Sequence, residues 1–206
     1  ISTIIEVFAA NAAAPHAQRT SKEPFMHTMH QRYVARTIIP AGQLAHTYGT
    51  DLLKGIDKNA FARHAVGARG ERVKSNHPAW VYGHLACYPA RMLEFIGHPE
   101  AAKLKKPHFE DLFKNGTECL DDPNGTIYPT MEEIVGAWDS GNKRALEVLA
   151  DTPDEAFERE NPAEGRFKER FPKVGGAIAF MIAAHPMSHF GQVSAWRRFM
   201  GMPSAM

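Results

Sequence analysis

Four segments of this chain repeat apolar residues with the period of an α-helix, and this pattern is the strongest restriction on its fold. In the first segment, residues 40–56, apolar side chains follow Ala41 at intervals of three, four, seven, eleven and fifteen positions. Comparable stripes run through residues 76–97, 130–149 and 173–200. No segment of useful length alternates as a strand does. The sequence therefore predicts an all-α fold, and four amphipathic helices fit a four-helix bundle.

Capping residues set the expected helix limits. Pro40 suits the first turn of the first helix, where a missing N–H costs nothing. Asn76 and Pro78 open the second helix, and Gly97 ends it. Thr130, with Glu133 three residues later, forms a capping box for the third. The connection over residues 97–129 is too long for a tight hairpin, so we expect a crossover along the bundle between helices 2 and 3. A short helix is expected to follow Thr152-Pro153-Asp154-Glu155.

The length of 206 residues favours one domain with an appended segment. We divide the chain into an N-terminal extension, residues 1–37, and a helical domain, residues 38–206. Residues 9–17 are Ala-rich and weakly resemble a secretory signal, but Glu6 interrupts the apolar stretch, so we favour a cytoplasmic protein. No apolar run reaches the roughly 18 residues that would cross a membrane. A formal net charge of +1 provides no field for nucleic acid or an anionic membrane.

The 11 histidines point to metal binding. His185 and His189 are four residues apart, so on a helix their imidazoles project from one face and can reach one divalent cation. Both lie on the apolar stripe, as does His84 in the second helix. Such a pair can also be an ordinary solvated or core feature. Three histidines around one cation leave open positions for water or substrate, which is typical of catalytic sites.

The other candidates leave alternatives open. Cys87 and Cys119 are too few for a four-thiolate zinc site; Cys87 could be a fourth ligand or a buried core residue. We interpret His77 as a capping or pocket residue. The remaining histidines are expected to be solvated: His16, His27, His30, His46, His64, His98 and His108.

Three short motifs carry a family resemblance. They are Asn76-His77-Pro78-Ala79-Trp80 followed by Gly83-His84-Leu85, Tyr128-Pro129-Thr130, and His185-x-x-x-His189-x-Gly191-Gln192. In this order and spacing, residues 38–202 resemble the DinB-like superfamily. The resemblance implies a four-helix bundle of up-down-down-up topology and a divalent metal, commonly nickel or zinc. It places the metal ligands on His84, His185 and His189.

The sequence departs from that family's pattern at Pro186. An interior proline removes a hydrogen bond and clashes with the carbonyl of Ile182, so we expect a kink or break between Ile182 and His185. The proline should also push His185 out of the α region. Gln192 is our candidate for orienting a ligand or the activated species, although it could instead bond a backbone group. Arg91 could attract an anionic substrate or lie on the surface.

These features predict a metal-dependent enzyme, a hydrolase or a thiol-dependent transferase, that activates water or a low-molecular-weight thiol. A small-molecule substrate would lie against apolar walls, for which we expect Val81, Tyr88, Met181 and Trp196. Trp80 and Trp196 are interpreted first as core residues and second as walls of this pocket. No general base stands out, and HExxH is absent. The alternative is a non-catalytic metal-binding or stress-related scaffold. Only the naming of the family suggests a DNA-associated role. The chain could form a homodimer.

Overall fold

The computed structural model describes residues 32–205, and most of these residues lie in helices. The all-α prediction is confirmed to that extent. A short antiparallel hairpin joins β1 (Ala65–Val66) to β2 (Arg72–Val73), between the first two long helical stretches. The helices, in chain order, are α1 (Tyr33–Leu52), α2 (Pro78–Ala86), α3 (Tyr88–Phe95), α4 (Ala101–Leu104), α5 (Pro107–Phe113), α6 (Met131–Ala150), α7 (Asp154–Phe157), α8 (Gly165–Arg170), α9 (Val174–Ala179), the π-helical turn η1 (Phe180–Ala184) and α10 (His185–Phe199).

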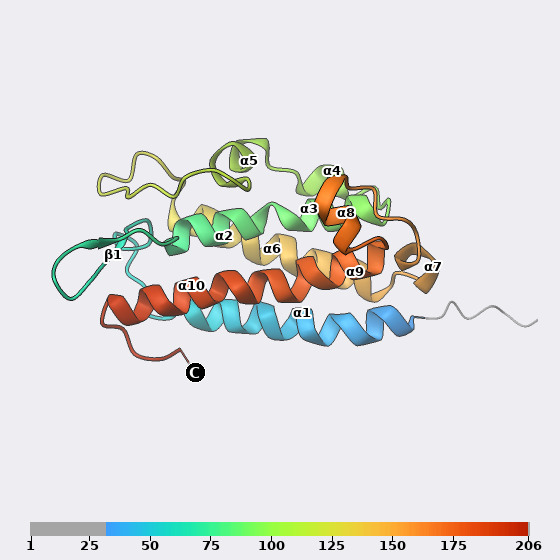
Figure 1. Cartoon of the computed structure of the whole chain (residues 1–206), viewed down its shortest axis with the longest axis horizontal. Coiled ribbons are helices and arrows are strands. Elements are labelled where there is room, and N and C mark those ends of the chain that lie inside the picture. The colour runs from blue at the N-terminus through green and yellow to red at the C-terminus, as the bar shows by residue number, and fades with distance from the viewer. Residues whose placement is uncertain (1–31, 206) are drawn as a thin grey trace, which may run out of the picture.

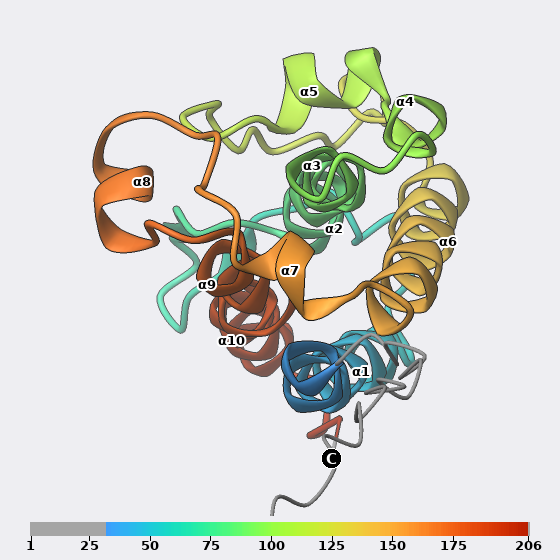
Figure 2. The same cartoon turned by 90° about the vertical axis from the view of Figure 1, so that its right-hand side faces the viewer.

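Four long helical stretches surround a common interior. Seen from one end, α1, α6, the α2–α3 pair and the α9–α10 stretch lie around it (Figure 2). Helices α4 and α5 lie beyond α2–α3, within the long connection to α6 (Figure 1). Across residues 32–205, every helix is too short or too polar to span a lipid bilayer.

The core depends on a strip of small residues along α1. Gly49 lies so close to the Phe190 and Trp138 rings that a Cβ there would overlap them. The Tyr82 hydroxyl donates a hydrogen bond to the Gly49 carbonyl at 2.5 Å. The predicted stripe was therefore partly wrong: Leu44 is 65% exposed, because the middle of the core face of α1 is formed by Gly42, Ala45 and Gly49.

Helix α1 begins before the proline that was expected to open it. Its first residue is Tyr33, and Pro40 lies inside the helix on an exposed face. The N–H groups of Tyr33 and Val34 each donate to the Asp154 carboxylate, at 3.0 Å. A distant carboxylate thus satisfies donors that a local cap would otherwise satisfy. The boundary between residues 37 and 38 stays a prediction, and residues 1–31 lie outside the described part.

The second helix is divided where the sequence predicted one helix. Helix α2 ends at Ala86 and α3 begins at Tyr88, because Pro89 has no N–H to continue the ladder. The N-cap is His77 rather than Asn76: the His77 Nδ1 accepts from the Trp80 N–H at 3.2 Å.

Several local signals are confirmed. Gly97 follows the second helix with φ of 70°. Both hydrogen bonds of the Thr130–Glu133 capping box are present at the start of α6. Helix α7 begins at Asp154, as its start signal indicated.

The last helix changes its winding just before Pro186. The π-helical turn η1 joins α9 to α10, and the His185 N–H donates to the Phe180 carbonyl five residues back. This turn lies where the sequence predicted a kink or break. His185 keeps α-helical angles, φ −65° and ψ −51°, so the expected displacement from the α region was wrong. We attribute this to the wider turn, which absorbs the lost bond and the bulk of the proline ring.

Candidate metal centre

Close packing of α5 on α2 fixes the orientation of His84. A Cβ on Gly83 would lie about 2.5 Å from the Phe113 ring, so the missing side chain allows this approach. It places the Phe113 carbonyl 2.6 Å from the His84 Nδ1. A carbonyl can only accept, so Nδ1 carries the proton and Nε2 keeps a free lone pair. The Trp80 ring stacks on the face of the His84 imidazole, with ring centres 4.8 Å apart.

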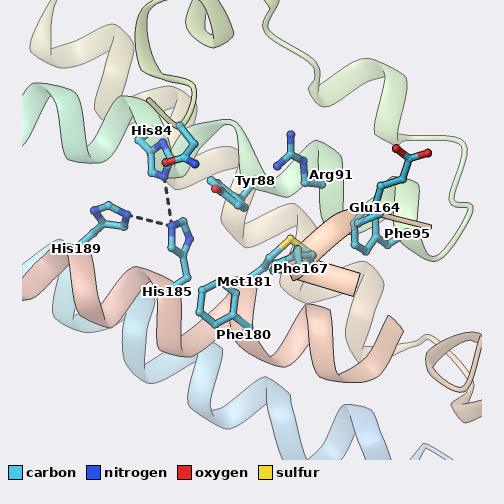
Figure 3. Close-up of a pocket in the computed structure, with 12 residues that line it drawn as sticks. His84, Tyr88, Arg91, Phe95, Glu164, Phe167, Phe180, Met181, His185 and His189 are labelled. Carbon is cyan, nitrogen blue, oxygen red and sulfur yellow. Dashed lines mark hydrogen bonds between the residues drawn. The ribbon is translucent and has the colours of Figure 1, made fainter. Parts of the chain in front are cut away.

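The histidine pair of α10 meets His84 across the interior. Figure 3 shows the three imidazoles facing one another. The His185 Nε2 lies 3.2 Å from the His84 Nε2 and 3.0 Å from the His189 Nε2. The structure therefore brings together the three residues that the sequence singled out. Their binding of a metal stays a prediction.

Two amides orient His189. The Gln192 Oε1 lies 3.2 Å from the His189 Nδ1 and also accepts from the Asn76 Nδ2 at 3.0 Å. With the amide oxygen as acceptor, the His189 Nδ1 is the protonated nitrogen and Nε2 again keeps its lone pair. Gln192 thus touches a candidate ligand, the first of the two options that the sequence left open.

The three nitrogens fit a divalent cation better than they fit one another. Bonds of 2.0–2.1 Å at tetrahedral angles separate two nitrogens by about 3.3 Å, close to the 3.0 and 3.2 Å found here. Without a cation, one shared proton on the His185 Nε2 cannot satisfy two opposing lone pairs. The His185 Nδ1 is also buried without a hydrogen-bond partner among residues 32–205. A cation would satisfy all three converging lone pairs at once.

Burial keeps the three imidazoles neutral. It lowers the pKa of His84 to about 4. Burial, followed by the proximity of His189 and His84, lowers the pKa of His185 to about 3. Burial also lowers the pKa of His189. At neutral pH all three are therefore neutral imidazoles with one unprotonated ring nitrogen, which is the state that binds metals.

A cavity of about 700 Å³ opens beside the three histidines. Tyr88 and Met181 line it, as expected; Val81 and Trp196 do not, because both are buried in the core. The Trp196 Nε1 instead donates to the Arg63 carbonyl at 2.8 Å. The Tyr88 ring packs against the His185 ring, and the centres of the two rings are 4.4 Å apart.

A second group of potential ligands, His64, His77 and Cys119, is committed to structural bonds. Besides its capping bond, His77 donates from Nε2 to the Leu120 carbonyl at 2.8 Å. The His64 Nε2 lies 3.0 Å from the Cys119 carbonyl, and burial raises the pKa of the Cys119 thiol to about 12. We therefore assign this group no metal.

Cys87 and the other described histidines lie outside the group of three converging imidazoles. Cys87 is not grouped with the three histidines, and its Sγ donates to the Gly83 carbonyl at 3.4 Å, which fits the core alternative. His46, His64 and His98 were expected to be solvated but are half-buried; His46 stacks on Trp138 with ring centres 4.8 Å apart. His108 is exposed, as expected, and His16, His27 and His30 lie outside the described residues. The roles of the Phe113 carbonyl and Asn76 were missed. For the Phe113 carbonyl, the sequence feature that could have indicated its role is Gly83, the glycine directly before His84.

Comparison with known families agrees with this geometry. The family model of the DinB superfamily matches residues 29–193. A search of curated proteins found no match. The matched range includes α2 and the part of α10 that carries His185 and His189, and it covers most of the sequence. The chain therefore belongs to the DinB superfamily.

Proposed function

We propose that this protein is a metal-dependent enzyme that activates a water molecule or a small thiol, as a hydrolase or a thiol-dependent transferase. One observation carries the proposal: three neutral imidazoles converge through their Nε2 atoms at the wall of a cavity large enough for a small molecule. Membership in the DinB superfamily supports metal binding, for which we propose nickel or zinc.

The residues around the centre have separate tasks. His84, His185 and His189 would hold the cation, which would supply the positive charge that lowers the pKa of a nearby water or thiol. The Phe113 carbonyl and Gln192 fix the tautomers of two of these histidines. Tyr88 covers the centre from the cavity side.

The chemistry of the cavity favours attack by an externally supplied nucleophile over a protein nucleophile. Burial raises the pKa of the Cys87 thiol to about 12, so this cysteine is not a thiolate at neutral pH. Among the described residues that line the cavity, Glu164 is the carboxylate, and it lies beside Phe95, away from the three histidines (Figure 3). Because of this placement we assign no residue as a general base.

We also propose the up-down-down-up bundle that the family resemblance implies. Helices α2–α3 and α6 run in one direction in Figure 1, and α1 and α10 run in the other, which supports this topology. The connection over residues 96–130, with α4 and α5 in it, returns the chain between the two parallel stretches.

The test combines metal analysis with a spectroscopic titration. Protein purified without chelators should contain about one divalent cation per chain. A cobalt-substituted form should change its absorption when a small thiol is added, and this change should be lost in His189→Ala. A cation that no thiol or small anion perturbs would instead favour the non-catalytic scaffold.

A further inference from the structure

We infer that the cavity takes a small carboxylic acid with an apolar or aromatic body, and that Arg91 binds its carboxylate. This inference rests on the proposed function, because it assigns the kind of molecule that reaches the same centre. It depends on four features of the cavity among the described residues: its apolar walls, the guanidinium of Arg91, the fixed position of that guanidinium, and its distance from the histidines.

Apolar side chains form most of the cavity wall. Tyr88 and Phe95 come from α3, Phe180 and Met181 come from η1, and Phe167 comes from α8. Figure 3 shows these side chains around one space beside His185. Such walls favour an apolar or aromatic body over a fully polar molecule.

Arg91 is the cation among the described lining residues. It is exposed at the mouth of the cavity. Within residues 32–205, arginine ion pairs are made elsewhere, by Arg32, Arg63, Arg72 and Arg144. The guanidinium of Arg91 thus has no carboxylate partner among the described residues, and its planar donors match a carboxylate in two parallel hydrogen bonds.

Tyr88 fixes the guanidinium at a useful distance from the centre. The Arg91 Cζ lies 5.5 Å from the centre of the Tyr88 ring, in a cation–π contact. The same ring lies 4.4 Å from the His185 ring. Because both separations meet at Tyr88, the guanidinium is at most about 10 Å from the His185 ring centre. A molecule the length of a phenylalkanoate spans this distance.

A second charged side chain of the cavity wall, Glu164, lies beside Phe95 at the end away from the three histidines (Figure 3). Glu164 and Phe167 belong to residues 162–171, a loop closed at its base by Asn161. The Asn161 N–H donates to the Pro172 carbonyl at 2.9 Å, and its Nδ2 donates to the Phe171 carbonyl at 2.8 Å. Among the ion pairs of residues 32–205 there is none between Glu164 and Arg91, so this carboxylate does not occupy the guanidinium.

Calorimetric titrations of the full chain test the inference with two pairs of probes. The first pair is 3-phenylpropionate and its uncharged amide; the second is 3-mercaptopropionate and its amide. Each is titrated into the zinc-loaded protein and into the chelator-treated protein. We expect the acid to bind about tenfold or more tightly than the amide in at least one pair. A preference in the phenyl pair assigns the carboxylate to the substrate, and one in the thiol pair assigns it to a thiol.

The variants separate Arg91 from other charges. In Arg91→Gln the preference for the acid should fall below about twofold, and Arg91→Lys should keep part of it. Arg69→Gln, which removes an equal charge from the exposed hairpin, should leave it unchanged. Because Arg91 is exposed, its variants should unfold at the wild-type temperature.

Three outcomes would overturn the inference. They are equal binding of acid and amide by the wild type, no binding of either pair up to about 10 mM, or a preference that persists in Arg91→Gln. The last result would place the carboxylate on the cation or at another residue. If the protein binds no zinc but the chelator-treated protein still prefers the acid over the amide, the proposed function is contradicted and the inference about Arg91 is not.

Discussion

Adding one methyl group at Gly83 should damage the metal centre through a residue that is not a ligand. A Cβ there would lie about 2.5 Å from the Phe113 ring, whereas ordinary contacts need at least 3.4 Å, so the two must separate by about 1 Å. Phe113 is fully buried and its ring cannot swing into solvent. The end of α5 must move with it, which stretches the 2.6 Å bond between the Phe113 carbonyl and the His84 Nδ1 beyond hydrogen-bond range.

The cost has two parts. Overpacking a core costs about 1–3 kcal/mol, and a buried N–H left without a partner costs a similar amount. We therefore expect Gly83→Ala to lower the free energy of unfolding by about 2–5 kcal/mol. In urea this would lower the midpoint by about 1 M or more. Zinc affinity, measured by competition with a chromophoric chelator, should fall about 10- to 100-fold, because His84 loses the group that orients it.

A matched glycine provides the control. A Cβ on Gly136, on an exposed face of α6, would meet no atom within 4 Å, so Gly136→Ala should be neutral or stabilise by up to about 1 kcal/mol. The double variant Gly83→Ala/Phe113→Val, which removes the clashing ring atoms, should lose less stability than the two single changes added together. Wild-type midpoint and zinc affinity in Gly83→Ala would show that the ring yields without moving its carbonyl, and would refute this reasoning.

Three further predictions concern the centre itself. His84→Ala should abolish stoichiometric zinc in elemental analysis, since each histidine supplies one of three bonds; zinc retained at wild-type affinity would remove His84 from the site. Gln192→Leu should weaken zinc binding about 10- to 100-fold and Asn76→Ala should weaken it less, as measured by the same chelator competition; equal affinities would restrict both amides to packing. In the folded metal-free protein the pKa values of His84 and His185 are lowered to about 4 and about 3. In the unfolded chain both histidines have the ordinary pKa of about 6.5, so below that pH the unfolded chain binds more protons than the folded protein. The free energy of unfolding should therefore decrease as the pH falls from about 6.5 towards 3, and a urea midpoint constant over that range in wild type, or an equal slope in His84→Gln, would contradict this.

The sequence predicted best what depends on neighbouring residues. The capping box of Thr130 and Glu133 is complete within four residues, and it appears as expected. The spacing of His185 and His189 likewise fixes their relative placement on a helix. For His84, the sequence provided only its place on an apolar face and a family resemblance, and the structure adds the contact with the other two.

What the sequence could not indicate depends on distant partners. The start of α1 was predicted seven residues too late, because the carboxylate that caps it belongs to Asp154, about 120 residues away. The core face of α1 was misplaced because Gly49 packs through its lack of a side chain, which a search for apolar residues overlooks. The displacement of His185 was wrong because a π-helical turn was not considered as a way to accommodate Pro186.

The separation of the three histidines along the chain has a consequence for biosynthesis. His84 precedes His185 by 101 residues, and α1 is capped only when α7 has been made. At 5–20 residues per second, about 5 to 20 s pass between synthesis of the first histidine and synthesis of the pair. During this interval the emerging chain carries a single imidazole where three are needed. The proposed cation site is therefore complete only after the C-terminal helix has been made, and a nascent chain stalled before α10 would lack two of the three candidate ligands.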